Sequence, residues 1–293
     1  MVRVTHKHNH PLRAGDGKDM SKKFGVLTIH GMGSQRPDYA NALQHNLYKK
    51  LREETIADLS FKSIWYHGDF QVHQDRVWEN MVQSGNPLDQ QRLRKFFLNF
   101  LSDAATSEFR PNEADSSYRR IQHTILRQIN ALRVELEDQD RPVIIIAHSL
   151  GCQIISNYIW DAQQNKGIWE GQEPIEFQKL GTARLLVTSG CNIPLFVSGL
   201  EQIVAISKPN NLFEWHNFYD RDDILGWPLK PLSKGFPNAY DNIVTQDREI
   251  NTGWTPLSHS DYWEDKDFIN PVADLIQAVH DSLPNDTRTT NHV

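Results

Sequence analysis

The sequence lacks several features that would define its class. Its only two cysteines, Cys152 and Cys191, cannot build a disulfide framework in a chain of 293 residues. No apolar run approaches the length of a membrane span, and no early run has the form of a signal peptide. The formal net charge is −6 and no basic block occurs, which argues against a nucleic-acid partner. We therefore expect a soluble, cytoplasmic protein with no membrane span and at most a peripheral membrane contact.

The order of apolar patterns along the chain predicts its domain organisation. Residues 1–22 and 285–293 are polar and lack apolar periodicity, which predicts a mobile tail and a frayed C-terminus. Between them, strand patterns alternate with helix patterns, and no internal repeat or linker interrupts the order. This alternation predicts a single α/β domain over residues 23–284, built on a doubly wound, mostly parallel sheet.

Individual elements follow from the same patterns. The expected strands lie at residues 24–30, 59–66, 143–146, 183–190 and 214–219. The expected helices lie at residues 39–54, 118–137, 152–160 and 265–283. Residues 226–251 hold three prolines and predict an irregular loop. Residues 67–112 depart from the alternation and predict a helical insertion.

The most informative stretch begins at a run of four β-branched apolar residues, Val143 to Ile146. Such a run predicts a strand that is buried on both faces, as in a parallel sheet. It leads through Ser149 into a helical pattern, and a serine on a sharp strand-to-helix turn is typical of a nucleophile elbow. The residues two before and two after that serine must be small, and Ala147 and Gly151 are. Ser149 is therefore the candidate nucleophile; the alternative is an ordinary turn with an incidental serine.

A glycine-rich segment follows the first expected strand. It contains Gly31 and Gly33, but the third glycine of a dinucleotide-binding loop would fall at Arg36 and is absent. A His-Gly-x-Gly run after a strand is instead the form of an oxyanion loop, in which glycines let backbone N–H groups face a reacting carbonyl oxygen. Met32 and Leu150 are expected to be the donors, each contributing about 3–4 kcal/mol of transition-state stabilisation.

A nucleophilic serine on such a turn needs an acid and then a histidine later in the chain. Asp220, Asp222 and Asp223 all follow an expected strand after the elbow. His259 lies on the loop before the last helix, whereas His280 lies within that helix. The predicted triad is therefore Ser149, one of these aspartates, and His259. The order and spacing of the residues leave the choice of aspartate open.

These motifs together resemble the α/β-hydrolase superfamily of serine esterases and lipases over roughly residues 24–283. The carboxyl third resembles the DDHD-type intracellular phospholipases and their lipase-like bacterial relatives. Their run Asp-Pro-Val-Ala-Tyr-Arg-Ile-Glu-Pro-Leu aligns without a gap with residues 223–232, and their Ser-His…Tyr-Trp signature matches Ser258-His259 and Tyr262-Trp263. The resemblance implies the α/β-hydrolase fold, selects Asp223 as the acid, and implies ester hydrolysis on an acyl lipid without a metal or cofactor. Ala147 departs from the usual glycine.

The expected substrate is an ester with a medium or long acyl chain. Phe96, Phe97 and Phe100 fall at helical spacing and could line an apolar acyl site. We expect residues 77–104 to act as a lid over that site, and the alternative is a fixed core helix. There are two alternatives: a short-chain carboxylesterase, or a non-catalytic ligand-binding protein of the same fold.

Overall fold

Buried apolar strands form one central sheet in the computed structural model. The structure describes residues 21–31, 35–66, 68–83, 91, 94, 95, 98, 116–232, 239–253 and 258–284. Six strands lie in the order β2-β1-β3-β4-β5-β6, and every neighbouring pair is parallel. Their bounds are β1 Phe24–Ile29, β2 Leu59–Ile64, β3 Val143–His148, β4 Ala183–Ser189, β5 Glu214–Asp220 and β6 Val244–Ile250. The predicted α/β class is confirmed, and the sheet is parallel throughout these strands.

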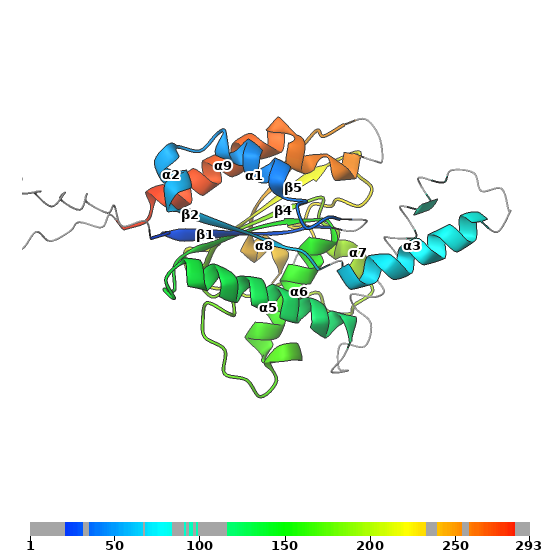
Figure 1. Ribbon diagram of the computed structural model, residues 1–293, viewed down its shortest axis with the longest axis horizontal. Coiled ribbons are helices and arrows are strands. Elements are labelled where there is room, and N and C mark those ends of the chain that lie inside the picture. The colour runs from blue at the N-terminus through cyan, green and yellow to red at the C-terminus, as the bar shows by residue number, and fades with distance from the viewer. Residues whose placement is uncertain are drawn as a thin grey trace, which may run out of the picture.

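Helices cover both faces of the sheet (Figure 1). One face carries α1 (Asn41–Tyr48), α2 (Glu53–Asp58) and α9 (Lys266–Asp281). The other face carries α5 (Ser117–Glu135), α6 (Leu150–Gln164) and α8 (Tyr240–Ile243). The remaining helices are α3 (Gly68–Gln83) and α7 (Ile193–Val197), with short 3₁₀ turns η1 (Gly167–Trp169), η2 (Ser258–Ser260) and η3 (Tyr262–Glu264). Each face of the sheet therefore has its own apolar layer, as expected of a doubly wound sheet.

The predicted central strand explains this two-layer arrangement. Val143 to Ile146 of β3 are completely buried, with Val143 and Ile145 facing one core and Ile144 and Ile146 facing the other. Successive side chains of a strand point to opposite faces, so a strand covered on both sides must be apolar at every position. On α5, buried Ile121, Ile125, Ile129 and Leu132 recur at helical spacing and form the stripe that packs on the sheet.

The strand order reverses between β1 and β3. From β1 the chain moves outward to β2, and it then crosses to the other side of β1 to form β3. In open α/β sheets, ligands bind outside the carboxyl ends of the strands at such a reversal. Gly31 follows β1 and Ser149 follows β3, so the two segments singled out in the sequence lie at this point.

Two predictions about the elements are wrong. The helical pattern at residues 39–54 is not one helix, because Arg52 is extended between α1 and α2. The predicted loop at residues 226–251 contains α8 and the strand β6. β6 lies at the edge of the sheet and reads Val-Thr-Gln-Asp-Arg-Glu-Ile, with only Val244 buried. An edge strand can be polar, so the apolar pattern that revealed the other strands was absent.

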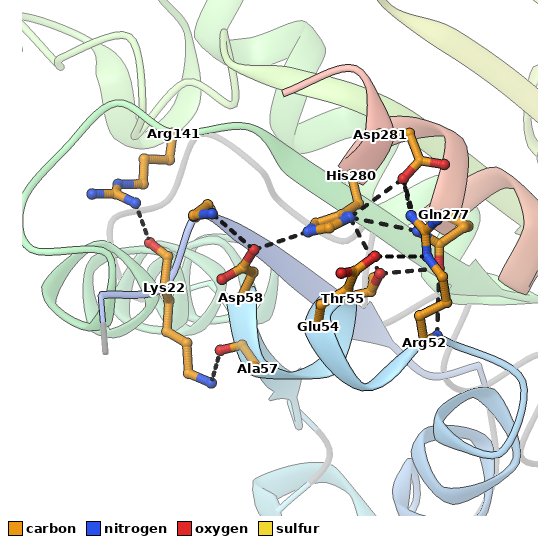
Figure 2. A network of polar contacts seen from close by, with 11 residues as sticks. Lys22, Arg52, Glu54, Thr55, Ala57, Asp58, Arg141, Gln277, His280 and Asp281 are labelled. Carbon is orange, nitrogen blue, oxygen red and sulfur yellow. Dashed lines mark hydrogen bonds and ion pairs between the residues drawn. The ribbon is translucent and has the colours of Figure 1, made fainter. Parts of the chain in front are cut away.

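The break before α2 directs polar side chains of α2 toward the last helix. Thr55 Oγ1 donates to Gln277 Oε1 at 3.0 Å, and Asp58 Oδ2 lies 2.9 Å from His280 Nε2 (Figure 2). Arg52 reaches Asp281 in the same network. This group lies at the end of the sheet where β1 and β2 begin, opposite the carboxyl ends of the strands.

Several predictions fall on residues that the structure does not describe. Residues 1–20 of the predicted tail and residues 285–293 lie outside the described residues, as do Phe96, Phe97 and Phe100. Within the predicted insertion at 67–112, α3 is the one continuous described element. Among the helices of the described part, none is both long and apolar enough to cross a membrane.

Candidate active site

The turn between β3 and α6 holds Ser149 in an unusual backbone conformation. Its φ and ψ are 53° and −124°, in a region that side chains rarely occupy. The Ser149 N–H donates to the carbonyl of Ser189 on β4 at 2.9 Å, which anchors the turn to the neighbouring strand. Strain of this kind is a feature of a nucleophile elbow, where it exposes the hydroxyl at the edge of the sheet.

The strand β1 and the helix α6 approach each other closely at Gly151, where there is no room for a side chain. A Cβ at this position would lie 2.5 Å from the carbonyl oxygen of His30 and 2.8 Å from that of Ile29. Both obstacles are backbone atoms of the chain leaving β1, so they cannot rotate away. Only glycine fits at position 151, in agreement with the size requirement predicted from the sequence.

The three predicted triad residues are brought together from three separate segments. His259 Nε2 lies 2.6 Å from Ser149 Oγ, and His259 Nδ1 lies 2.8 Å from Asp223 Oδ2. His259 belongs to η2, and Asp223 lies in the turn after β5. All three residues are buried. Their hydrogen bonds form a continuous chain from the carboxylate to the hydroxyl.

The structure also distinguishes among the three aspartates. Asp223 contacts His259, whereas Asp222 is exposed. Asp220 accepts hydrogen bonds from the backbone N–H of Asp222 at 2.8 Å and from that of Thr252 at 2.6 Å. Asp220 therefore holds the loop together, and Asp223 is the carboxylate that faces the histidine. The catalytic role of Asp223 stays a prediction.

Asp223 is held by further donors. The Leu225 N–H donates to Oδ1 at 2.9 Å, and the Tyr262 hydroxyl donates to Oδ2 at 2.9 Å. Burial by itself raises the pKa of Asp223, but the hydrogen bond and charge of His259 and these two donors outweigh it, so the pKa is lowered. The ionised carboxylate can only accept, so Nδ1 of His259 carries the proton and Nε2 is free to accept from Ser149.

The predicted oxyanion loop passes close to Ser149 at Gly31. A Cβ on Gly31 would lie 2.5 Å from Cβ of Ser149 and 3.1 Å from its Oγ, so no side chain fits there. The Gly31 carbonyl accepts from the Tyr66 hydroxyl at 3.0 Å and from His30 Nδ1 at 2.6 Å. His30 in turn stacks on Tyr66, with ring centroids 4.2 Å apart. Two buried side chains therefore hold the carbonyl of Gly31 in place.

The predicted oxyanion donors are described in part. Leu150 is the first residue of α6, where the backbone N–H groups of the first turn have no partner inside the helix. It follows Ser149 directly, as an oxyanion donor at an elbow must. Met32 and Gly33 lie outside the described residues.

Sequence reasoning missed several residues that contact the triad. Gly190 has a φ of 52°, and a Cβ there would lie 3.0 Å from Cε1 of His259. A Cβ on Gly226 would lie 2.4 Å from Oδ2 of Asp223. Tyr262 enters the sequence argument only through the family resemblance, and no sequence pattern singles out His148, the residue before Ser149. The sequence gives no signal of either glycine's partner, because His259 reaches Gly190 from a distant segment and Asp223 meets Gly226 only once the turn between them has folded.

Comparisons with known proteins add no family assignment. The chain matches no protein-family model and no curated protein. In the part of the chain that the structure describes, no group of three or more His, Cys, Asp or Glu side chains could hold a metal ion.

Proposed function

We propose that the chain is a serine hydrolase of the α/β-hydrolase fold that cleaves carboxylic esters. The observation that carries the proposal is the buried hydrogen-bonded chain from Asp223 through His259 to Ser149, on a strained strand-to-helix turn. The order of the segments supports the fold: the serine follows β3, the acid follows β5, and the histidine precedes α9.

The geometry supports a two-step reaction. His259 Nε2 takes the hydroxyl proton of Ser149 as Oγ attacks the ester carbonyl, and it then passes that proton to the departing alcohol. The acyl group remains on Oγ. Water next attacks the acyl carbonyl while His259 takes its proton, the bond to Oγ breaks, and the proton returns to Oγ as the acid leaves. Asp223 stabilises the imidazolium in both steps.

Labelling with a fluorophosphonate tests the reaction. We expect the folded protein to form a stable adduct at Ser149, identified by mass spectrometry of the peptide. Ser149→Ala removes the nucleophile and should abolish labelling, whereas Ser198→Ala removes an exposed serine and should leave labelling unchanged. A folded protein that is not labelled at Ser149 contradicts the proposal and favours a non-catalytic binding protein.

The proposed substrate is an acyl-lipid ester rather than a short-chain ester. α3 begins soon after β2, at the carboxyl edge of the sheet, and it carries Val77 and Met81 at 46% and 54% exposure. Two apolar residues four positions apart lie on one helix face, so α3 presents exposed apolar surface in the segment that follows β2. This supports the predicted lid over residues 77–104.

Esters of graded chain length test the substrate class. We expect p-nitrophenyl esters of medium and long acids to be turned over faster than the acetate and butyrate. Replacing both Val77 and Met81 by serine should leave the free energy of unfolding nearly unchanged, because both are exposed, and should weaken turnover of the long-chain esters selectively. A sharp preference for acetate or butyrate contradicts the lipid substrate and leaves the esterase intact.

A further inference from the structure

The residue before the nucleophile, His148, contacts the loop that carries the catalytic histidine. His148 Nε2 lies 2.7 Å from the backbone carbonyl oxygen of His259. Its ring also lies against the rings of His259, Tyr262 and Trp263, at centroid distances of 5.0, 5.8 and 5.7 Å. The side chain of His148, at the end of β3, therefore touches both η2 and η3.

The opposite side of the same ring faces the oxyanion loop. A Cβ on Gly31 would lie 3.0 Å from Nδ1 of His148, so the backbone of Gly31 passes beside that nitrogen. His148 thus lies between the loop that follows β1 and the loop that carries His259. Both loops must hold fixed positions relative to Ser149 for the proposed reaction to proceed.

The chemistry of the contact fixes the state of the ring. A carbonyl oxygen can only accept a hydrogen bond, so Nε2 of His148 carries a proton and donates. Removal of the ring from water and the neighbouring charge of His259 lower the pKa of His148 to about 3, although the contact with the His259 carbonyl and the charge of Asp223 act in the other direction. The ring is therefore neutral at physiological pH, with Nε2 protonated and Nδ1 bare.

We propose that His148 is a positioning residue for the proposed hydrolase. Its Nε2–H holds the carbonyl of His259 and thereby keeps the His259 ring in line between Asp223 and Ser149. The contact is independent of the bonds that the His259 ring itself makes, because it acts on the backbone of that residue. His148 touches neither reacting atom in this role, and its effect on the rate passes through His259.

Two substitutions of similar size test the donor. His148→Met keeps the length of the side chain and removes the donor, whereas His148→Gln places an amide N–H at a comparable distance from the backbone. We expect His148→Met to lower kcat and the fluorophosphonate labelling rate by about 10- to 100-fold with little change in KM, because misplacement of the base affects the chemical step. His148→Gln should recover most of that loss.

The rates are expressed per folded protein, so that loss of stability is not mistaken for loss of positioning. Equal rates in His148→Met and the unaltered chain overturn the inference, as does a His148→Gln variant that is as slow as His148→Met. This inference rests on the proposed function, and the two fail differently. An unlabelled parent protein contradicts the hydrolase itself, whereas a labelled parent matched by His148→Met contradicts the positioning role alone.

If the variants do not fold, a measurement on the unaltered chain can test the role of His148. Nitrogen chemical shifts of the histidine rings report the tautomer of His148, which faces the titratable groups His259, Asp223 and Tyr262. We expect the Nε2–H tautomer, with no titration of His148 between about pH 5 and pH 9. An Nδ1–H tautomer overturns the inference, because its Nε2 has no proton to donate to the His259 carbonyl.

Discussion

The hydroxyl of Tyr262 lies 2.9 Å from Oδ2 of Asp223, the same carboxylate oxygen that His259 Nδ1 contacts at 2.8 Å. The Tyr262 oxygen also accepts the backbone N–H of Asp220 at 2.8 Å. Burial and the charge of Asp223 raise the pKa of Tyr262, so its hydroxyl remains a donor. One fully buried side chain thus joins the end of β5 to the acid of the proposed triad.

Tyr262→Phe should therefore impair both stability and turnover. It removes a donor to Asp223 and leaves the buried N–H of Asp220 without its acceptor, which costs about 1–3 kcal/mol in the free energy of unfolding. Less firm orientation of Asp223 should lower kcat by about tenfold. Denaturant unfolding and ester kinetics measure the two effects. Tyr48→Phe on α1 is the control, because Tyr48 accepts from Gln44 far from the triad. Equal behaviour of the two variants contradicts the assigned role.

Replacement of the acid should affect the rate far more than the fold. Asp223→Asn keeps the size of the side chain but loses the charge that fixes the His259 tautomer, and we expect kcat to fall by about 10⁴-fold. Asp222→Asn changes an exposed neighbour and should be nearly neutral. Steady-state kinetics of the two variants give the two kcat values to be compared. If Asp222→Asn proves the more damaging change, Asp222 is the acid and the geometry around His259 has been misinterpreted.

The sequence was sufficient to locate elements that are buried on both sides. Val143 to Ile146 form a fully buried strand because every position is apolar, and this pattern has few other interpretations. The edge strand β6 has exposed residues on both faces, Thr245, Gln246 and Glu249, so no apolar pattern marked it. The break before α2 also escaped prediction, and the contact of Thr55 with Gln277 of α9 joins residues 222 positions apart.

For the site, the sequence predicted residue types and their order but not their contacts. Ser149 and His259 were identifiable because an elbow and a loop histidine have local signatures. His148 adjoins Ser149 in the chain, yet its partner is the carbonyl of a residue 111 positions away. Gly226 lies only three residues after Asp223, yet the need for a glycine there appears only when the turn folds Asp223 back against it. Contacts between distant segments become visible only once the sheet places those segments together.

The close approach at the elbow gives a prediction about stability. Gly151→Ala would place Cβ 2.5 Å from the His30 carbonyl oxygen, and the strand or the helix must move to admit it. Forced overpacking of this kind costs about 1–3 kcal/mol or more. We expect a lower unfolding midpoint together with loss of labelling at Ser149. Gly199→Ala is the matched control, because a Cβ there meets nothing within 4 Å. Tolerance of both substitutions would contradict the close packing of β1 against α6 at Gly151.

The network at the opposite end of the sheet gives a prediction about acid stability. Asp58 lies 3.1 Å from Lys23 Nζ and 2.9 Å from His280 Nε2 (Figure 2). Burial by itself raises the pKa of Asp58, but the hydrogen bonds and charges of His280 and Lys23 outweigh it and lower the pKa. The folded protein therefore binds a proton at Asp58 less readily than the unfolded chain does.

This difference sets the direction of the pH effect. The stabilisation is present in full above the unfolded-state pKa of about 3.9, and it is lost as the pH falls through the lower pKa of the folded state. Asp58→Asn should lower the free energy of unfolding by about 1 kcal/mol or less near pH 7, since the pair is partly exposed. The gap between variant and parent should close as the pH falls below about 4. Urea unfolding at a series of pH values measures this gap, with Asp274→Asn, an exposed change on α9, the helix that carries His280, as the control. A gap that stays constant down to about pH 2 would show that the contribution of Asp58 does not depend on its charge.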